Sequence, residues 1–256
     1  MPELWGRCAL VVPCYNEAQR LNVPVYAAFL RACPPGFRMI FVDDGSGDET
    51  LRVLESLRAE VGDVAVVLAK KPNSGKADAV RFGMNYAVTE LGAEVTGFWD
   101  ADLATPLEAV ADLLTVLETD AQVQMVFGAR VKLLGRRIER RVARHYLGRV
   151  FATVVSNVLE LPVYDTQCGA KLFRVSDDFR EVLRDPFLSR WIFDVEIIAR
   201  FIRRRGVSWV QGSIYEYPLH QWEDIEGSKV KSGDFLKAAG EILAIWNKYL
   251  RGGRRP

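Results

Sequence analysis

Short apolar segments alternate with amphipathic segments along the first half of the chain. The apolar segments are rich in β-branched and aromatic residues and predict strands at 7–13, 37–42, 64–69, 95–99 and 123–127. Between them, apolar residues recur at helical spacing and predict helices that begin at Asp48 or span 77–88 and 107–117. Strands that alternate with helices favour a mostly parallel sheet flanked by helices. The pattern therefore predicts an α/β fold.

The composition is that of an ordinary globular protein. The chain has 256 residues, of which 49% are hydrophobic and 26% charged, so we expect a single domain over 1–256 with one large core. No apolar run approaches the roughly 20 residues that span a bilayer, and the first residues carry no secretion signal. The four cysteines lack metal-binding or disulfide spacing, and there are only two histidines. These features predict a cytoplasmic protein with reduced thiols and without a zinc site.

Positive charge is concentrated in one segment, although the formal net charge is only +1. Apolar positions recur there at helical spacing as far as Leu161, which predicts a basic amphipathic helix over about 136–161. The cations of the segment are Lys132, Arg136, Arg137, Arg140, Arg141, Arg144 and Arg149. Such a helix fits a membrane surface, and it equally fits a solvated helix packed on the sheet. Nucleic-acid binding is not expected, because no aromatic platform or groove-reading motif accompanies the charge.

Acidic residues follow the predicted strands at the points where those strands end. Asp100 and Asp102 come directly after the strand at 95–99, and Asp43 and Asp44 follow the second strand. In a parallel sheet these ends line one crevice, where two carboxylates could hold Mg²⁺ or Mn²⁺ against a phosphate. A helix cap and a solvated turn are the alternatives for either pair taken alone. Their joint occurrence favours a site for a nucleoside diphosphate.

Residues 13–17, at the end of the first predicted strand, should line the same crevice. Tyr15 could stack on a base there, because its ring is flat and apolar. A carboxylate, from Glu17 or from the acids after the second strand, could accept hydrogen bonds from an imide N–H and a ribose hydroxyl. The crevice therefore has groups for a nucleoside as well as for a diphosphate.

These crevice segments resemble motifs of the inverting family 2 glycosyltransferases, which have the Rossmann-like GT-A fold. The matching segments are 11–17, 42–46, 73–76, 79–81, 100–102 and 128–130. Three further segments resemble the polyprenyl-phosphate branch of that family, and most closely its dolichyl-phosphate β-glucosyltransferases. They are 165–173, 190–196 and 226–229. The resemblance covers about residues 7 to 233.

The resemblance implies a nucleotide-sugar-binding half at 1–130 and an acceptor-binding half at 131–256, the latter with the basic helix and a C-terminal helical segment. The implied catalytic residues are Asp100, Asp102, Asp165 and Arg130, and Asp100 and Asp102 would also hold Mg²⁺ or Mn²⁺. The implied nucleotide contacts are Pro13, Tyr15, Glu17, Asp43, Asp44, Lys76 and Ala101. The implied contacts to the acceptor phosphate are Arg136, Arg137, Lys229 and Lys231.

The reaction implied is inverting transfer of a sugar, with glucose from UDP-glucose favoured, to a polyprenyl phosphate at the cytosolic face of a membrane. Eukaryotic members of the branch carry an N-terminal membrane helix that this sequence does not show, so the basic helix would provide peripheral membrane contact. Ala104 stands where dolichyl-phosphate mannose synthases place a glutamine, which counts against a mannose donor.

Several alternatives remain open at this stage. One is a GDP-mannose-dependent polyprenyl-phosphate mannosyltransferase, another a relative with a soluble acceptor, and a third a non-catalytic nucleotide-sugar-binding protein at a membrane. Asp165 could be a buried turn cap instead of an acid near the reacting centre. The segment from Phe193 to Ile202 has the spacing of a buried helix, from which Asp194 or Glu196 could touch substrate.

Overall fold

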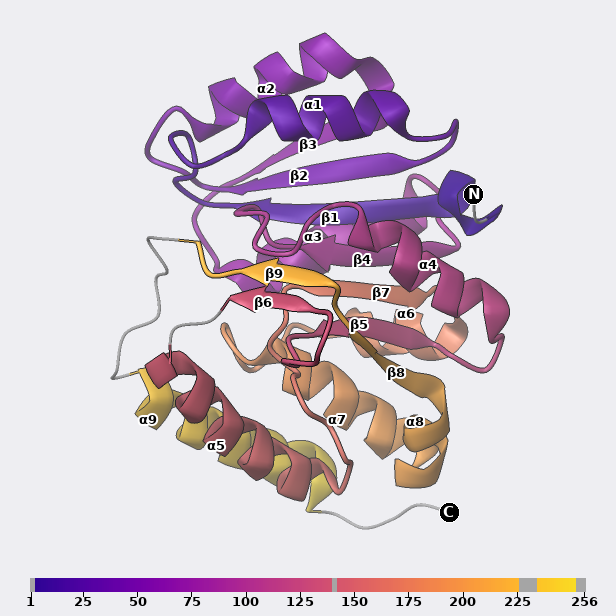
Figure 1. Ribbon diagram of the computed structural model, residues 1–256, viewed down its shortest axis with the longest axis vertical. Coiled ribbons are helices and arrows are strands. Elements are labelled where there is room, and N and C mark those ends of the chain that lie inside the picture. Colours follow the sequence, from indigo (N-terminus) through magenta and orange to yellow (C-terminus); the bar gives the residue numbers. More distant parts are fainter. Residues whose placement is uncertain (1–2, 140–141, 226–233, 252–256) are drawn as a thin grey trace.

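A seven-stranded sheet, with the order β3-β2-β1-β4-β7-β5-β8, lies at the centre of the part of the chain that is described. The computed structural model describes residues 3–139, 142–225 and 234–251 (Figure 1). β7 runs antiparallel to both neighbours, and the other pairs are parallel. The strands are β1 (Cys8–Cys14), β2 (Arg38–Asp44), β3 (Ala65–Lys70), β4 (Val95–Trp99), β5 (Met125–Ala129), β7 (Ala170–Arg174) and β8 (Ile214–Pro218).

Helices cover both faces of this sheet. One face carries α1 (Val23–Ala32), α2 (Thr50–Val61) and α4 (Ala109–Thr119), together with the short segments η1 (Glu3–Arg7) and η2 (Gly62–Val64). The same face carries a small parallel sheet of β6 (Arg137–Glu139) and β9 (Gln221–Glu223). The other face carries α3 (Lys76–Thr89), α5 (Val142–Leu159), α6 (Asp177–Arg184), α7 (Phe193–Arg205), α8 (Val207–Ser213), α9 (Asp234–Ile245) and the π-helical segment η3 (Trp246–Leu250).

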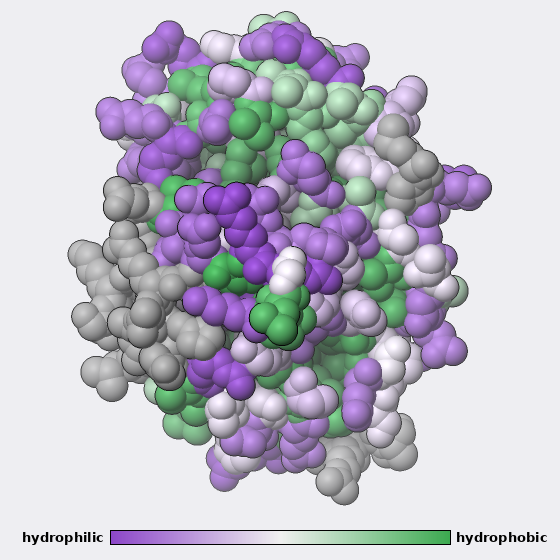
Figure 2. All heavy atoms as spheres, viewed as in Figure 1, coloured by the Kyte–Doolittle hydropathy of each residue, from purple (hydrophilic) through white to green (hydrophobic). Residues whose placement is uncertain are grey.

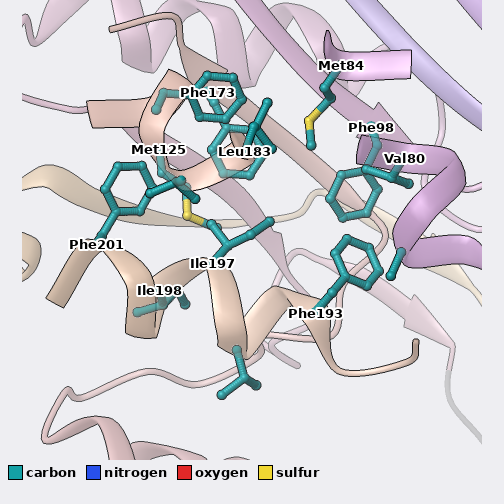
Figure 3. Close-up of a cluster of buried hydrophobic side chains, with 14 of the residues drawn as sticks. Val80, Met84, Phe98, Met125, Phe173, Leu183, Phe193, Ile197, Ile198 and Phe201 are labelled. Carbon is teal, nitrogen blue, oxygen red and sulfur yellow. The ribbon is translucent and has the colours of Figure 1, made fainter. Parts of the chain in front are cut away.

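The core is divided into two layers by the sheet. In β1, Ala9 and Val11 pack into one layer, and Leu10 and Val12 into the other. Burial on both faces explains why the parallel strands read as continuous apolar runs. Figure 3 shows part of one layer, where Phe98 of β4 lies against Phe193 of α7, with ring centroids 5.3 Å apart. The N-terminus of α7 is thereby fixed beneath the end of β4.

The predicted α/β fold with a mostly parallel sheet is confirmed. The predicted strands match β1 to β5 within about two residues, and the helices at 77–88 and 107–117 match α3 and α4. The sequence pattern did not predict β7 and β8, which complete the sheet. No described helix is both long and apolar enough to cross a membrane.

The basic helix expected over about 136–161 is wrong at its N-terminal end. Arg137, Ile138 and Glu139 form β6 and pair with β9, and α5 begins only at Val142. Ile138 is buried between two exposed charged residues, a two-residue period that fits a strand. Arg136 lies on the turn before β6, so neither it nor Arg137 belongs to the helix. Arg140 and Arg141 lie outside the described residues.

Candidate active site

The acidic strand ends meet at one edge of the sheet, as the sequence predicts. The backbone N–H of Asn16, after β1, donates to the Ser46 hydroxyl after β2 at 3.0 Å. Arg20 joins the β1 end to the β4 end, because its guanidinium lies 3.4 Å from Glu17 and 3.8 Å from Asp102. The Tyr26 hydroxyl of α1 donates to the carbonyl of Ala101 at 3.2 Å. These contacts set the loops after β1, β2 and β4 around a common crevice.

Asp100 and Asp102 are both half-buried and are held by different partners. Lys76 Nζ, at the start of α3, lies 2.5 Å from Asp100 Oδ1. The backbone N–H of Ala104 donates to Asp102 Oδ1 at 3.1 Å. Gly169 packs against Asp100, and a Cβ at this glycine would lie 2.0 Å from Asp100 Oδ2. The Asp100 side chain therefore has its position only because residue 169 has no side chain.

The electrostatics of this pair favour a cation. Burial and then the charge of Asp100 raise the pKa of Asp102, although the Ala104 amide, Lys76 and Arg20 act against the shift. Burial lowers the pKa of Lys76, but the carboxylates of Asp100 and Asp194 outweigh it, so the pKa of this ammonium is raised. Two neighbouring carboxylates are hard oxygen donors of the kind that Mg²⁺ and Mn²⁺ prefer.

A metal ion here would need ligands from outside the protein. Within residues 3–139, 142–225 and 234–251 no group of three or more His, Cys, Asp or Glu side chains could hold a metal. Mg²⁺ is commonly bound by one or two carboxylates together with substrate phosphates and water. The Asp100–Asp102 pair fits that mode of binding.

Asp43 and Asp44, at the end of β2, are both buried but differ in their partners. The Asp44 carboxylate accepts from the Asn73 side chain at 2.9 Å and from the backbone N–H groups of Ser74 and Gly75 at 3.1 and 2.7 Å. Asp44 therefore anchors the loop that leads into α3 and to Lys76. Asp43 accepts a long hydrogen bond from the Ser46 N–H, at 3.4 Å.

Arg130 and Asp165 form a two-pronged ion pair beside the crevice. Arg130 Nε and Nη2 donate to the two carboxylate oxygens of Asp165, each at 2.6 Å, and the Arg130 backbone N–H donates at 3.0 Å. The guanidinium also lies over the Trp222 ring, 5.1 Å from its centroid. Burial lowers the pKa of Arg130, but Asp165 outweighs it and raises the pKa above its ordinary value. Asp165 thus fixes the orientation of Arg130.

Sequence reasoning missed Lys171, which lies beneath the crevice. Its side chain is 0% exposed, and its Nζ lies 2.8 Å from Asp194 Oδ1 and within 5.6 Å of the ring centroids of Phe98 and Phe127. The Gln167 amide donates to Asp194 at 3.4 Å. A lysine inside the apolar run of β7 was the available signal, since such residues are almost never fully buried unless paired.

Replacing Lys171 by Met should destabilise the protein in a pH-dependent way. Burial already raises the pKa of Asp194, and Lys171 opposes that shift, so its removal raises the pKa further. When the pKa of a carboxyl is higher in the folded protein than in the unfolded one, the protein loses stability as pH rises from the unfolded-state pKa through the folded-state pKa. We expect a loss of about 3–5 kcal/mol near neutral pH that shrinks toward pH ~4, measured by urea unfolding.

The matched control is Arg31→Met, because Arg31 pairs with Glu60 at 2.6 Å on the surface. An exposed pair of this kind is worth less than about 1 kcal/mol. A Lys171→Met deficit that is equally small, or constant with pH, would contradict the buried-pair account.

The remaining predicted site residues lie around the same edge or outside the described part. Tyr15 is exposed at the end of β1, whereas Glu17 is buried. Arg136 is half-buried, and Arg137 is exposed and lies 3.2 Å from Glu139. Lys229 and Lys231 lie outside the described residues. The individual roles of the predicted site residues stay predictions.

The sequence is similar to one group of known enzymes. A family model described as Glycosyl transferase family 2 matches residues 9–179. The human dolichyl-phosphate beta-glucosyltransferase is 32% identical over 279 residues, covering 100% of this chain and 81% of that protein. The Saccharomyces cerevisiae enzyme of the same name is 29% identical over 265 residues, covering 95% of this chain and 75% of that protein.

The fold is similar to those of solved sugar transferases. Glucosyl-3-phosphoglycerate synthase from Mycobacterium tuberculosis, solved with Mn²⁺, UDP-glucose and phosphoglyceric acid, matches with TM-score 0.65 and 18% identity over 96% of this chain and 83% of that one. A mannosyltransferase from Pyrobaculum calidifontis, in complex with GDP-Man and Mn²⁺, matches with TM-score 0.64 and 18% identity over 98% and 66%. At such identity the likeness shows a GT-A-like fold.

Proposed function

The chain belongs to glycosyl transferase family 2 and is a glycosyltransferase, and from this premise we propose that it transfers glucose from UDP-glucose to a polyprenyl phosphate. The observation that carries the proposal is the similarity to dolichyl-phosphate beta-glucosyltransferases along nearly the whole chain. The crevice supports it independently. It joins an exposed aromatic ring, a buried acidic strand end and a pair of half-buried carboxylates at one edge of the sheet.

The donor would lie across the ends of β1, β2 and β4. Tyr15 would stack on the base, and the buried Asp43 would accept from the uracil imide. Asp44 would act through the 73–75 loop, which it anchors. Lys76 would then face the diphosphate, because its ammonium already lies beside Asp100.

The residues present fit a divalent metal, which Asp102 would hold with Asp100 nearby. When bound, Mg²⁺ or Mn²⁺ would offset the negative charge that develops on the departing UDP. The protein itself supplies two further cations near these carboxylates, Lys76 and Arg20.

The acceptor phosphate would attack without a general base. The second pKa of a phosphate monoester is about 6, so the group is largely dianionic near neutral pH. One of its oxygens would form the bond to the anomeric carbon from the face opposite UDP, whose bond breaks, and the configuration inverts. Two phosphorylated substrates repel each other, so the protein must hold them with cations. Arg130 is fixed for this by Asp165, and Arg136 and Arg137 follow it on the chain.

Membrane association is part of the proposal. A polyprenyl chain stays in the bilayer, so the enzyme would work while bound peripherally to the cytosolic face of a membrane. The exposed cations near Arg130, namely Lys132 and Arg137, support this placement, since each is worth about 1 kcal/mol near an anionic surface.

Replacing Asp43 by Ala should weaken UDP binding by about 1–3 kcal/mol, because a buried polar partner of the base is removed. Asp44→Ala should weaken it as well, by releasing the 73–75 loop. Titration calorimetry with UDP measures both, and Asp63→Ala, an exposed acid in η2, is the control that should leave the affinity unchanged. Unchanged UDP affinity in both crevice variants would place the nucleotide elsewhere.

The donor is tested by turnover of a panel of labelled nucleotide sugars with polyprenyl phosphate and Mn²⁺. We expect UDP-glucose to be used in preference to GDP-mannose, in keeping with Ala104 in this sequence. Preferential use of GDP-mannose would move the proposal to a mannosyltransferase. Nucleotide binding without any turnover would identify a binding protein.

A further inference from the structure

The turn between β5 and β6 presents two leucines to solvent. Leu133 is 49% exposed and Leu134 is fully exposed. The backbone N–H of Arg136 donates to the Leu133 carbonyl at 3.1 Å, and Gly135 has a φ of +82°, a conformation that glycine adopts readily. The leucines are therefore held at the tip of a hydrogen-bonded turn.

Cations surround this apolar tip. Lys132 and Arg137 flank it along the chain and are exposed, and Arg136, next to Arg137, is half-buried. Among the described residues, Arg136 Nη1 is buried and has no hydrogen-bond partner. Figure 2, in the same view as Figure 1, shows an apolar projection over the connection from β5 to β6 with hydrophilic residues around it. Apolar side chains ringed by cations match the interface of an anionic bilayer.

The turn lies beside the acceptor half of the site. It begins directly after Arg130, which Asp165 fixes through two hydrogen bonds. It ends in β6, whose Arg137 N–H donates to the His220 carbonyl at 2.8 Å, just before β9. The turn is thus tied on both sides to the segments that carry Arg130 and Trp222. A surface bound by the leucines would lie close to these groups.

We propose that residues 132–137 form a membrane anchor, in which Leu133 and Leu134 enter the apolar layer of an anionic bilayer and the flanking cations contact lipid phosphates. The proposal rests on the proposed function only in one respect: an enzyme with a lipid-borne acceptor needs to bind the membrane. A second copy of the chain is a weaker candidate for the partner that covers the two leucines. Stable protein interfaces bury about 1,200–2,000 Å², far more than two leucines offer, whereas a bilayer needs only inserted side chains and charge.

The test compares three full-length variants with the wild type in sedimentation with vesicles of phosphatidylcholine and about one third phosphatidylserine. Leu133→Ser/Leu134→Ser should weaken vesicle binding about tenfold at both low and high salt. Lys132→Glu/Arg137→Glu should weaken it strongly at low salt and little at high salt, because salt screens only the charges. Val25→Ser is the control, since Val25 is 42% exposed on α1, away from this turn, and should bind like the wild type.

Two further measurements separate this proposal from the proposed function. The leucine variant should keep wild-type UDP affinity and wild-type transfer to a short water-soluble prenyl phosphate, and lose about tenfold in transfer to the same acceptor group on a long chain in vesicles. Suppose that the wild type binds vesicles but transfers no sugar, and that the leucine variant loses vesicle binding. This outcome would support the anchor and refute the proposed function.

Three results would overturn the anchor whatever the enzyme assay shows. They are absence of vesicle binding by the wild type, vesicle binding by the leucine variant equal to wild type, and an equal loss in Val25→Ser. A leucine variant that differs only in its oligomeric state by ultracentrifugation would assign the tip to a second copy instead.

Discussion

Replacing Asp102 by Asn should reduce sugar transfer by at least about 10³-fold while leaving the fold intact. The substitution keeps the shape of the side chain and its contact with the Ala104 N–H, but removes the negative charge that would hold the metal. Loss of charge stabilisation in the transition state at such a site costs about 4 kcal/mol or more. Initial rates with saturating UDP-glucose and Mn²⁺ measure the loss, and circular dichroism checks the fold.

Asp63→Asn is the matched control, because it makes the same chemical change at an exposed acid of η2. It should retain wild-type activity. Excess chelator should abolish activity in the wild type, and added Mn²⁺ should restore it. Full activity in chelator, or in Asp102→Asn, would contradict the assignment of Asp102 to a metal.

Replacing Asp165 by Asn should damage both stability and turnover. The change leaves the Arg130 guanidinium, which is only 15% exposed, without its counter-charge, and breaking a largely buried pair in this way costs about 3–5 kcal/mol. A guanidinium that is no longer fixed would also misplace the acceptor phosphate, for which we expect about a 10²-fold loss of kcat. Urea unfolding and steady-state kinetics measure the two effects separately.

A double variant distinguishes the ion pair from the individual residues. Arg130→Met/Asp165→Leu removes both charges, so it should be less destabilised than the sum of the two single changes. It should remain catalytically impaired, because Arg130 no longer positions the phosphate. Glu94→Gln, which breaks the exposed pair with Arg7, is the control and should cost less than about 1 kcal/mol. Additive losses in the double variant would show that the pair does not act as a unit.

The sequence was sufficient to predict the crevice because its acids follow parallel strands directly. Asp44 and Asp100 lie at or just after the ends of β2 and β4, and an apolar strand followed by a carboxylate is a local signal. Lys76 was placed near the nucleotide by the family resemblance of residues 73–76, which directly precede the helix predicted at 77–88. The sequence did not show that the Asp44 carboxylate is engaged in hydrogen bonds to the 73–75 loop. These three hydrogen bonds join groups about thirty residues apart in the chain, so no local pattern predicts them.

The acceptor side was harder to predict because it depends on long-range pairing. The Lys171–Asp194 pair joins an antiparallel strand to the first turn of α7, and no local pattern reports such a contact. The charges around Arg136 and Arg137 were assigned to a helix, since a three-residue strand is too short for its period to stand out. Gly135, with a positive φ, was the local signal that the chain turns before β6.

The most direct test of the proposed function is to incubate the purified chain with labelled UDP-glucose, polyprenyl phosphate and Mn²⁺, and to characterise the lipid product. The account predicts a glucosyl monophosphate lipid with inverted, β configuration at the anomeric carbon, formed by the wild type and not by Asp102→Asn. The account would be contradicted if the protein bound UDP and transferred glucose to a soluble acceptor but formed no labelled lipid.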